Sequence, residues 1–361
     1  MKQRNADIDL FKFLFSWVIV LFHLSSRTKI GCVGGFFGVD YFLIVSGFFL
    51  FRSFEKQRSE GRLSTPGAYF LHRFGRFFPW MATALVFAFY VSRIDAGQIT
   101  GTKSLLSALF EDVWELLLVK WCGLTEDGFL LNPPGWTVSS MLLAGFVLWG
   151  CLYYGKEPFR RLLLPVTLMV GFGVWRHLPS ADYSAWLGFT VFGTLRAWLD
   201  MCLGWYCLRL SDALACCRFK RLGKGLLTAF ECVSMAFVFA VTFLFSSRFA
   251  QWSCMLLFLV DIAVASSGCS YLNAALSKLP FLPMLGEFSF SLYLIHLPFI
   301  TLYLKTAEVG AWHFLPLRFV VLISLAACAH LLVTKLLIRL FRRLAPRLRA
   351  ALCEKDSVPV S

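Results

Sequence analysis

Charged side chains are scarce in this chain. Asp, Glu, Lys and Arg make up only 16% of its 361 residues, whereas soluble globular domains contain about 25%. Hydrophobic residues account for 58%, and the mean hydropathy is +0.69. This composition excludes an ordinary soluble domain and predicts an integral membrane protein.

The sequence also lacks the cysteine and histidine spacing of a metal site or a disulfide scaffold. Most of its 12 cysteines lie within or beside apolar runs, where cysteine behaves as a small buried hydrophobe. Cys216 and Cys217 are adjacent, and no cysteine pair has a histidine at the spacing of a zinc ligand set. We therefore expect no metal and no disulfide framework.

Long polar linkers and internal repeats are absent as well. No composition shift divides the chain, so we expect one integral-membrane domain over residues 1–361. The lack of a repeat also argues against a secondary transporter built from two inverted halves.

What the chain does contain is a series of long apolar runs. A helix needs roughly 20 residues to cross a hydrocarbon core of about 30 Å. The runs predict an all-α polytopic protein with about ten transmembrane helices. The expected spans lie near 10–25, 33–51, 77–92, 136–154, 162–178, 186–208, 225–246, 250–268, 285–305 and 314–338.

The basic residues indicate the orientation. Most of the 35 Lys and Arg residues fall at the N-terminus, in alternate short loops and at the C-terminal end, which predicts that both termini are cytoplasmic. Residues 339–361 are expected to form a basic cytoplasmic tail that meets anionic lipid headgroups. Because these charges are spread over loops, the net charge of +14 does not indicate a nucleic-acid partner.

The longest outer loop, 93–135, carries apolar stretches at 104–110 and 114–119. Together they predict an amphipathic helix that lies in the membrane interface or covers an outward-facing site.

His23 and Asp40 stand at adjoining ends of the first two expected spans. An ionisable group at membrane depth costs roughly 2.5–3.5 kcal/mol, which favours a functional role. Both side chains are expected near the outer face, where a carboxylate beside an imidazole would make a general base. A histidine that merely bonds a neighbouring helix is the alternative.

Two further groups of residues are candidates for contact with a ligand. Arg73 and Arg76, three residues apart on a helical start, can bind phosphates such as those of coenzyme A, although anchoring on the cytoplasmic side explains each arginine equally well. Ser46, Gly47 and Phe48 allow close approach of a ligand, or serve ordinary small-residue helix packing.

Later candidates are weaker when taken one at a time. Trp136 opens the fourth expected span, where an aromatic-belt role is the default. Arg196 and Asp200 are four residues apart and are expected to neutralise each other. His296, midway through the ninth span, is either functional or a tie between helices.

Five short motifs follow one another along nearly the whole chain. They are Asp-Ile-Asp-Leu-Phe-Lys at 7–12 with His23; Gly38-Val39-Asp40 before Ser46-Gly47-Phe48; Arg73-x-x-Arg76 with Pro79; Trp136 with Ser139; and Gly286 through Ser291-Leu292-Tyr293 to His296. In this order they resemble the acyltransferase 3 family of bacterial integral-membrane O-acyltransferases. Some members add an esterase-like domain after the last span, and this chain resembles the stand-alone form.

The resemblance implies an O-acetyltransferase of the bacterial cytoplasmic membrane, crossing it many times. It would move an acyl group, usually acetyl, from cytoplasmic acyl-coenzyme A to a hydroxyl of an extracytoplasmic or lipid-linked glycan. His23 would be the catalytic base, oriented by Asp40. The donor would contact Arg73 and Arg76 and pass the Ser46-Gly47-Phe48 segment. Candidate substrate-binding residues are Trp136, Ser139, His296 and Arg196.

Two positions depart from the family pattern. Met141 stands where many members have a glutamate after the tryptophan, and Lys12 stands where many have arginine. The first change removes a carboxylate, and the second keeps the charge but loses the planar guanidinium.

A transporter of a lipid-linked sugar or small acid is the alternative function. In that case the intramembrane residues His23, Asp40, Arg196 and Asp200 would form a relay. A non-catalytic membrane sensor is a third class. Transfer of label from acetyl-coenzyme A to a glycan would separate the enzyme from both.

Overall fold

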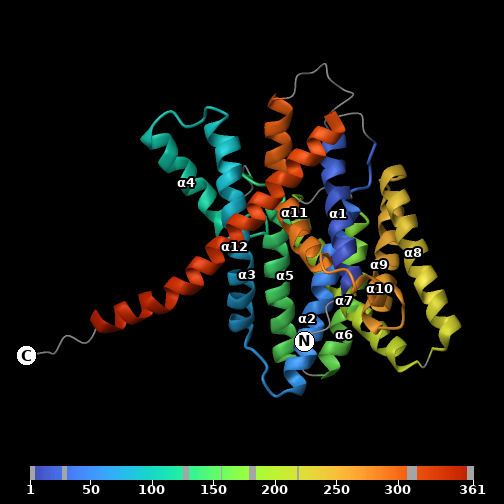
Figure 1. Ribbon diagram of the computed structural model, residues 1–361. Helices are drawn as coiled ribbons and strands as arrows, with labels where there is room; N and C mark the ends of the chain where they lie inside the picture. The colour runs from blue at the N-terminus through green and yellow to red at the C-terminus, as the bar shows by residue number, and fades with distance from the viewer. Residues whose placement is uncertain are drawn as a thin grey trace, which may run out of the picture.

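The computed structural model describes residues 5–26, 31–124, 130–155, 157–178, 184–217, 219–306 and 315–355. Within these ranges the chain is all-α, as the apolar runs predict (Figure 1). The helices are α1 (Ala6–Ser25), α2 (Phe37–Ser59), α3 (Pro66–Phe89), the π-helical turn η1 (Tyr90–Ile94), α4 (Thr102–Leu116), α5 (Gly135–Tyr154), α6 (Glu157–Trp175), α7 (Phe192–Cys216), α8 (Arg221–Leu244), α9 (Arg248–Ser267), α10 (Leu272–Leu276), α11 (Leu282–Thr306) and α12 (Leu315–Lys355).

Eight helical segments in the described ranges are long and apolar enough to cross a membrane, which confirms a polytopic membrane protein. They are α1, α2, α3 with η1, α5, α8, α9, α11 and α12. The other two expected spans, near 162–178 and 186–208, coincide with α6 and α7. The apolar part of α6 is short, covering Leu164–Trp175. Helix α7 is long but carries Arg196, Asp200 and Arg209 along its length.

The charged helix α7 is kept inside the bundle. It packs against α2, α5, α6 and α9. At the crossing with α2, Gly47 faces the backbone of Met201 and Gly204 faces the backbone of Phe48, so closely that a Cβ atom on either glycine would overlap its neighbour. Glycine is therefore required at this crossing, because only the absence of Cβ lets the two backbones touch.

The helices that hold the spans expected near 33–51 and 77–92 extend beyond the apolar runs. Helix α2 continues to Ser59 and α3 already begins at Pro66, so Arg73 and Arg76 lie well inside α3. Thr65 caps α3 by accepting a hydrogen bond from the N–H of Ala68, and proline at the first helical position suits this start. Basic residues lower the hydropathy of this segment without interrupting its helix.

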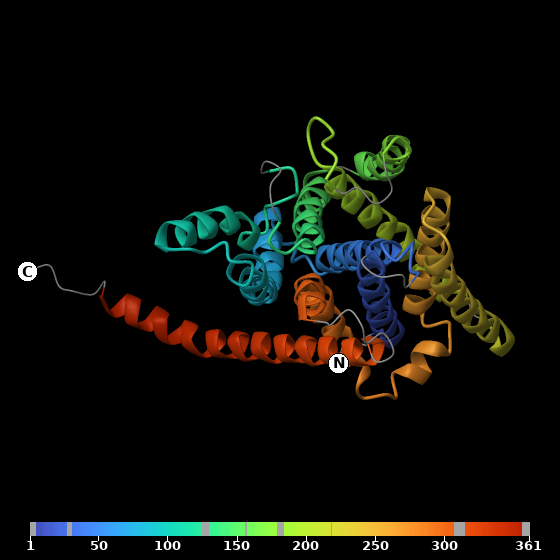
Figure 2. The same cartoon turned by 90° about the horizontal axis from the view of Figure 1, so that it is seen from above.

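The amphipathic helix expected in the outer loop is confirmed as α4. Arg93 of η1 pairs with Glu111 and Asp112, at 2.9 and 3.0 Å, and so fastens α4 to the end of α3. Seen from above, α4, α8 and α12 lie at the edge of the bundle, around α1, α2 and α5 (Figure 2). The predicted basic tail begins on α12, which continues as helix to Lys355 and extends beyond the bundle (Figures 1 and 2).

Candidate functional site

A small cavity of about 140 Å³ brings together four of the predicted site residues. His23 reaches it from α1, Trp136 from α5, Arg196 from α7 and His296 from α11. The complete lining is Ile19, Phe22, His23, Phe36, Val39, Pro133, Pro134, Trp136, Arg196, Tyr293, His296 and Leu297. Residues far apart in the sequence thus place two imidazoles and a guanidinium on one largely apolar space.

The two histidine rings lie against each other. Their centroids are 5.1 Å apart and their planes are tilted by 37°. His23 is half-buried, whereas His296 is completely buried. The Nδ1 atom of His296 lies 2.6 Å from the carbonyl oxygen of Tyr293. A carbonyl only accepts hydrogen bonds, so Nδ1 carries the hydrogen and the neutral ring keeps its lone pair on Nε2. No described residue hydrogen-bonds to that Nε2.

Arg196 is held in place by Asp40. Its Nε donates to Oδ1 of Asp40 at 2.7 Å, and its Nη2 donates to the carbonyl oxygen of Phe36 at 3.0 Å. Gln251 of α9 donates to Oδ2 of Asp40 at 2.7 Å. No described residue accepts a hydrogen bond from Nη1, and Arg196 lines the cavity, so a group bound there can use the remaining N–H donors of the guanidinium. With only 2% of its side chain exposed, Arg196 needs this pairing, because a buried unpaired charge is strongly destabilising.

These contacts change two sequence-based expectations. Within the described chain, the hydrogen bonds of Asp40 go to Arg196 and Gln251, so its link to the cavity runs through the arginine and not through the His23 ring. The expected pairing of Arg196 with Asp200 is wrong, because the guanidinium turns to Asp40 on α2. Spacing along one helix identifies a shared face but not a partner on the next helix.

The expected donor residues are only partly brought together. Arg73 donates from Nη2 to Oγ of Ser46 at 3.3 Å and from Nε to the hydroxyl of Tyr69 at 3.2 Å. Arg76, one helical turn further along, is exposed. Gly47 packs against the backbone of α7, and Phe48 is completely buried in the core. Of the Ser46-Gly47-Phe48 segment, Ser46 is thus the residue in contact with Arg73.

The two remaining positions of the tryptophan motif lie in the core. Ser139 is buried, and its hydroxyl has no hydrogen-bond partner among the described residues. Met141, at the place of the glutamate in many family members, packs half-buried against the hydrophobic core. Neither side chain lines the cavity, whereas Trp136 does.

Sequence reasoning missed the role of Glu115 on α4. Its two carboxylate oxygens accept hydrogen bonds from the backbone N–H groups of Leu131 and Asn132, both at 2.8 Å. Asn132 in turn donates to the carbonyl oxygen of Leu294 at 2.9 Å. Burial raises the pKa of Glu115 to about 7, although the two backbone hydrogen bonds act in the opposite direction.

This contact braces the wall of the cavity. Pro133 and Pro134, which line it, directly follow the segment that Glu115 holds. Helix α4 is therefore joined to the wall of the candidate site. The available signal was an acidic residue on the otherwise apolar 114–119 stretch.

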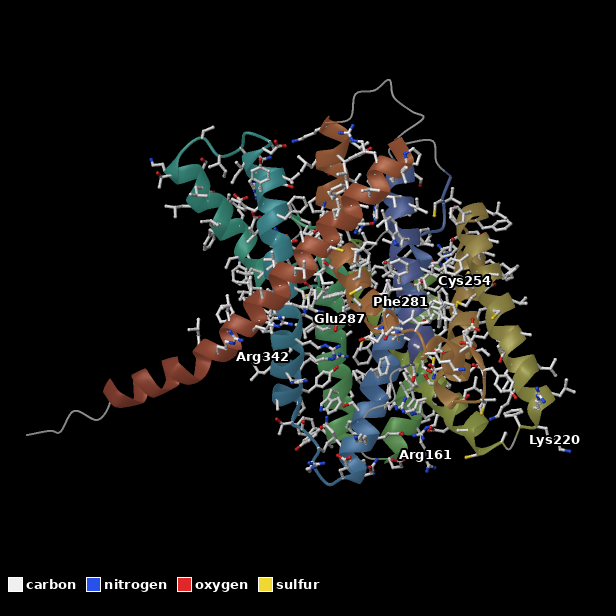
Figure 3. All side chains as sticks on the ribbon, in the orientation of Figure 1. Arg161, Lys220, Cys254, Phe281, Glu287 and Arg342 are labelled. Carbon is white, nitrogen blue, oxygen red and sulfur yellow. The ribbon has the colours of Figure 1, made fainter. Side chains whose placement is uncertain are left out.

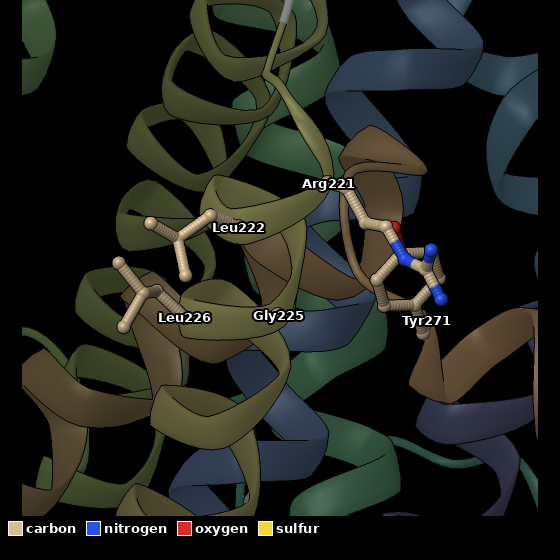
Figure 4. A pocket seen from close by; sticks show the side chains of 5 residues that line it. All are labelled: Arg221, Leu222, Gly225, Leu226 and Tyr271. Carbon is tan, nitrogen blue, oxygen red and sulfur yellow. The ribbon is translucent and has the colours of Figure 1, made fainter.

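A larger hollow of about 590 Å³ lies on the surface at the start of α8. Its lining comprises Arg221, Leu222, Gly225, Leu226 and Tyr271. Figure 4 shows Arg221 beside the Tyr271 ring, with Leu222 and Leu226 on the opposite side. It holds one charged group and no base, so the smaller cavity is the better candidate for catalysis.

A protein-family model described as an acyltransferase domain matches residues 5–334. The match covers every residue that lines the small cavity. Searches of curated proteins and of solved structures gave no significant match.

Proposed function

This chain belongs to the acyltransferase 3 family of membrane acyltransferases, and from that we propose that it transfers an acetyl group from cytoplasmic acetyl-coenzyme A to a hydroxyl of an extracytoplasmic or lipid-linked glycan. The observation that carries the proposal is the meeting of His23, His296 and Arg196 in one cavity. Acyl transfer to a hydroxyl needs a base for the hydroxyl proton and a positive group for the carbonyl oxygen, and these side chains are of the required kinds.

His23 is the base that contacts the acceptor. It lines the cavity and is half-buried, so the space it faces can admit a hydroxyl. Removal of the hydroxyl proton as the oxygen attacks the thioester carbonyl is a typical task for imidazole, whose ordinary pKa lies near neutrality.

Arg196 binds the carbonyl oxygen of the thioester. As the hydroxyl attacks, this oxygen becomes negatively charged, and Nη1 of the guanidinium can donate a hydrogen bond to it. Asp40 and Gln251 fix the guanidinium before the substrate arrives. We therefore assign Asp40 to the positioning of Arg196. The aromatic and proline side chains around them, with Trp136 among them, exclude water from the reacting groups.

Arg73, Arg76 and Ser46 form the entry for the donor. Guanidinium groups bind phosphates strongly, and coenzyme A carries several. The start of α3 lies at the end of the bundle opposite to α4, where Figure 3 also places Arg161 and Lys220. Basic residues at this end support a cytoplasmic face there, in a bacterial cytoplasmic membrane.

Labelled acetyl-coenzyme A tests the proposal. Membranes that contain the protein are expected to pass the label to a glycan, and His23→Ala is expected to abolish this transfer without loss of protein from the membrane. The control is His177→Ala, which removes an exposed histidine outside the cavity. If His23→Ala transfers label as fast as His177→Ala does, the assignment of the base fails. Uptake of a sugar or acid without any labelled glycan would indicate a transporter instead.

A further inference from the structure

His296 has features that binding of a substrate does not require. Resting on the function proposed above, we propose that His296 is a second catalytic residue: its Nε2 receives the proton that His23 removes from the acceptor hydroxyl and returns it to the departing coenzyme A thiolate. His296 then shares the base function with His23.

Among the described residues, the hydrogen bonding of His296 stays within its own helix. Its Nδ1 bonds to the carbonyl oxygen of Tyr293, which lies one turn earlier on the same helix. His330 of α12 shows the contrasting arrangement: one ring nitrogen lies 2.6 Å from the hydroxyl of Ser291 on α11, and the other lies 2.8 Å from that of Thr83 on α3. A histidine that joins helices uses both nitrogens, whereas His296 uses one.

The bond to Tyr293 also selects the tautomer. With the hydrogen on Nδ1, the lone pair resides on Nε2, and the ring is prepared to accept a proton there without rearrangement. Leaving a buried ring nitrogen unpaired costs free energy that a structural residue would avoid. The unpaired Nε2 therefore indicates a site kept ready for a proton.

The surroundings limit the pair of histidines to one proton. The ring centroids are 5.1 Å apart, so two imidazolium ions would repel each other at this distance in a poorly hydrated cavity. The guanidinium of Arg196 faces the same cavity and adds to the repulsion, and no carboxylate belongs to the lining described for it. A proton taken up by one ring therefore makes the other ring a poor acceptor for a second one.

The transfer balances without a further reactant. The acceptor O–H bond breaks as its oxygen bonds to the acyl carbon, and the proton goes to His23. The bond between the acyl carbon and sulfur then breaks, and the electron pair stays on sulfur as thiolate. The proton passes from His23 to Nε2 of His296, directly or through one water, and from there to the thiolate. The products are the acylated glycan and coenzyme A as thiol, with both histidines neutral again.

The test compares His296→Asn with His23→Gln and with the double variant. Asparagine can still donate to the carbonyl oxygen of Tyr293 but offers no basic nitrogen. We expect kcat for label transfer to fall about 100-fold or more in each single variant, with KM for acetyl-coenzyme A little changed. Because the two residues act as one unit, the double variant should be no slower than the slower single variant.

His330→Gln is the matched control, since it removes a buried histidine that joins helices. It is expected to lower the melting temperature while kcat per folded molecule stays near that of the parent. As a second measurement, imidazole added to His296→Gly should restore part of kcat, whereas benzene, which can fill the same space but has no basic nitrogen, should not.

Three results would overturn the proposal: His296→Asn with kcat within about three-fold of the parent, a change in KM alone, or multiplied losses in the double variant together with no rescue of His296→Gly by imidazole. Each of these leaves the proposed acyl transfer standing as long as the parent labels the glycan. Absence of any labelled glycan with the parent protein would refute the proposed function itself.

Discussion

Removal of the negative charge of Asp40 is predicted to destabilise the protein strongly. In Asp40→Asn the shape is kept, and Gln251 can still pair with the new amide, because its Oε1 has no partner in the described chain and can replace its NH₂ by rotation of the amide. What is lost is the charge opposite Arg196, whose side chain is 2% exposed. Breaking a buried ion pair on one side costs about 3–5 kcal/mol, since the other charge stays buried without compensation.

A double-mutant cycle measures this cost. Arg196→Gln alone should also destabilise by about 3–5 kcal/mol, because it leaves the buried carboxylate unpaired. The combined Asp40→Asn and Arg196→Gln variant should be clearly more stable than the sum of the single losses predicts, since the two opposite charges of the pair are removed together. All three variants should lose label transfer by about 100-fold or more if Arg196 stabilises the charge on the carbonyl oxygen.

The assay is the unfolding midpoint of purified protein in one detergent, combined with label transfer by the same preparations. Asp95→Asn is the control: Asp95 pairs with Lys305 at 2.6 Å, but both side chains are substantially exposed, so its loss should cost less than about 1 kcal/mol. Equal stability of Asp40→Asn and Asp95→Asn would refute the reasoning. Additive losses in the double variant would also refute it.

Three further predictions follow from single contacts. Because burial raises the pKa of Glu115 from its ordinary value of 4.5 to about 7, the protonated form is favoured by folding. Its contribution to stability is therefore complete below about pH 4.5 and is lost as the pH rises through about 7. Between these pH values the melting temperature of the parent should fall relative to that of Glu115→Gln. Parallel curves of melting temperature against pH would contradict the assignment. Gly47→Ala should destabilise by about 1–3 kcal/mol because its Cβ would overlap the backbone of α7, whereas Gly75→Ala, which meets open space on α3, should be neutral or stabilising in the same thermal assay. Arg73→Gln combined with Arg76→Gln should weaken coenzyme A binding in calorimetry by ten-fold or more, and unchanged affinity would reduce both residues to anchors on the cytoplasmic side.

The positions of helix ends could be predicted from the sequence, but rotation about each helix axis could not. Hydropathy located most of the spans, and His23 and Asp40 do lie at adjoining helix ends, in the last turn of α1 and the first turn of α2. Which way each side chain points depends on how the helices pack. The packing of α2 against α7 pairs Asp40 with Arg196. For the same reason nothing in the sequence paired His23 with His296, which lie on α1 and α11.

Polarity misled the sequence analysis wherever the bundle supplies a partner. The basic start of α3 resembles a loop by hydropathy, yet it is helical because Thr65 and Pro66 define its beginning. Glu115 resembles a surface residue of an interfacial helix, yet its buried carboxylate accepts hydrogen bonds from two backbone N–H groups. In both cases a tertiary or capping contact decides the outcome, and a hydropathy window does not include such contacts.

The most direct test of the account uses proteoliposomes with labelled acetyl-coenzyme A on one side and the glycan acceptor on the other. If the cavity of His23, Arg196 and His296 joins a cytoplasmic donor to an outer acceptor, the parent protein will label the acceptor across the bilayer. His23→Gln will fail to do so while the vesicles stay sealed. Transfer by His23→Gln at the rate of the parent, or labelling only when donor and acceptor share one side, would contradict the account.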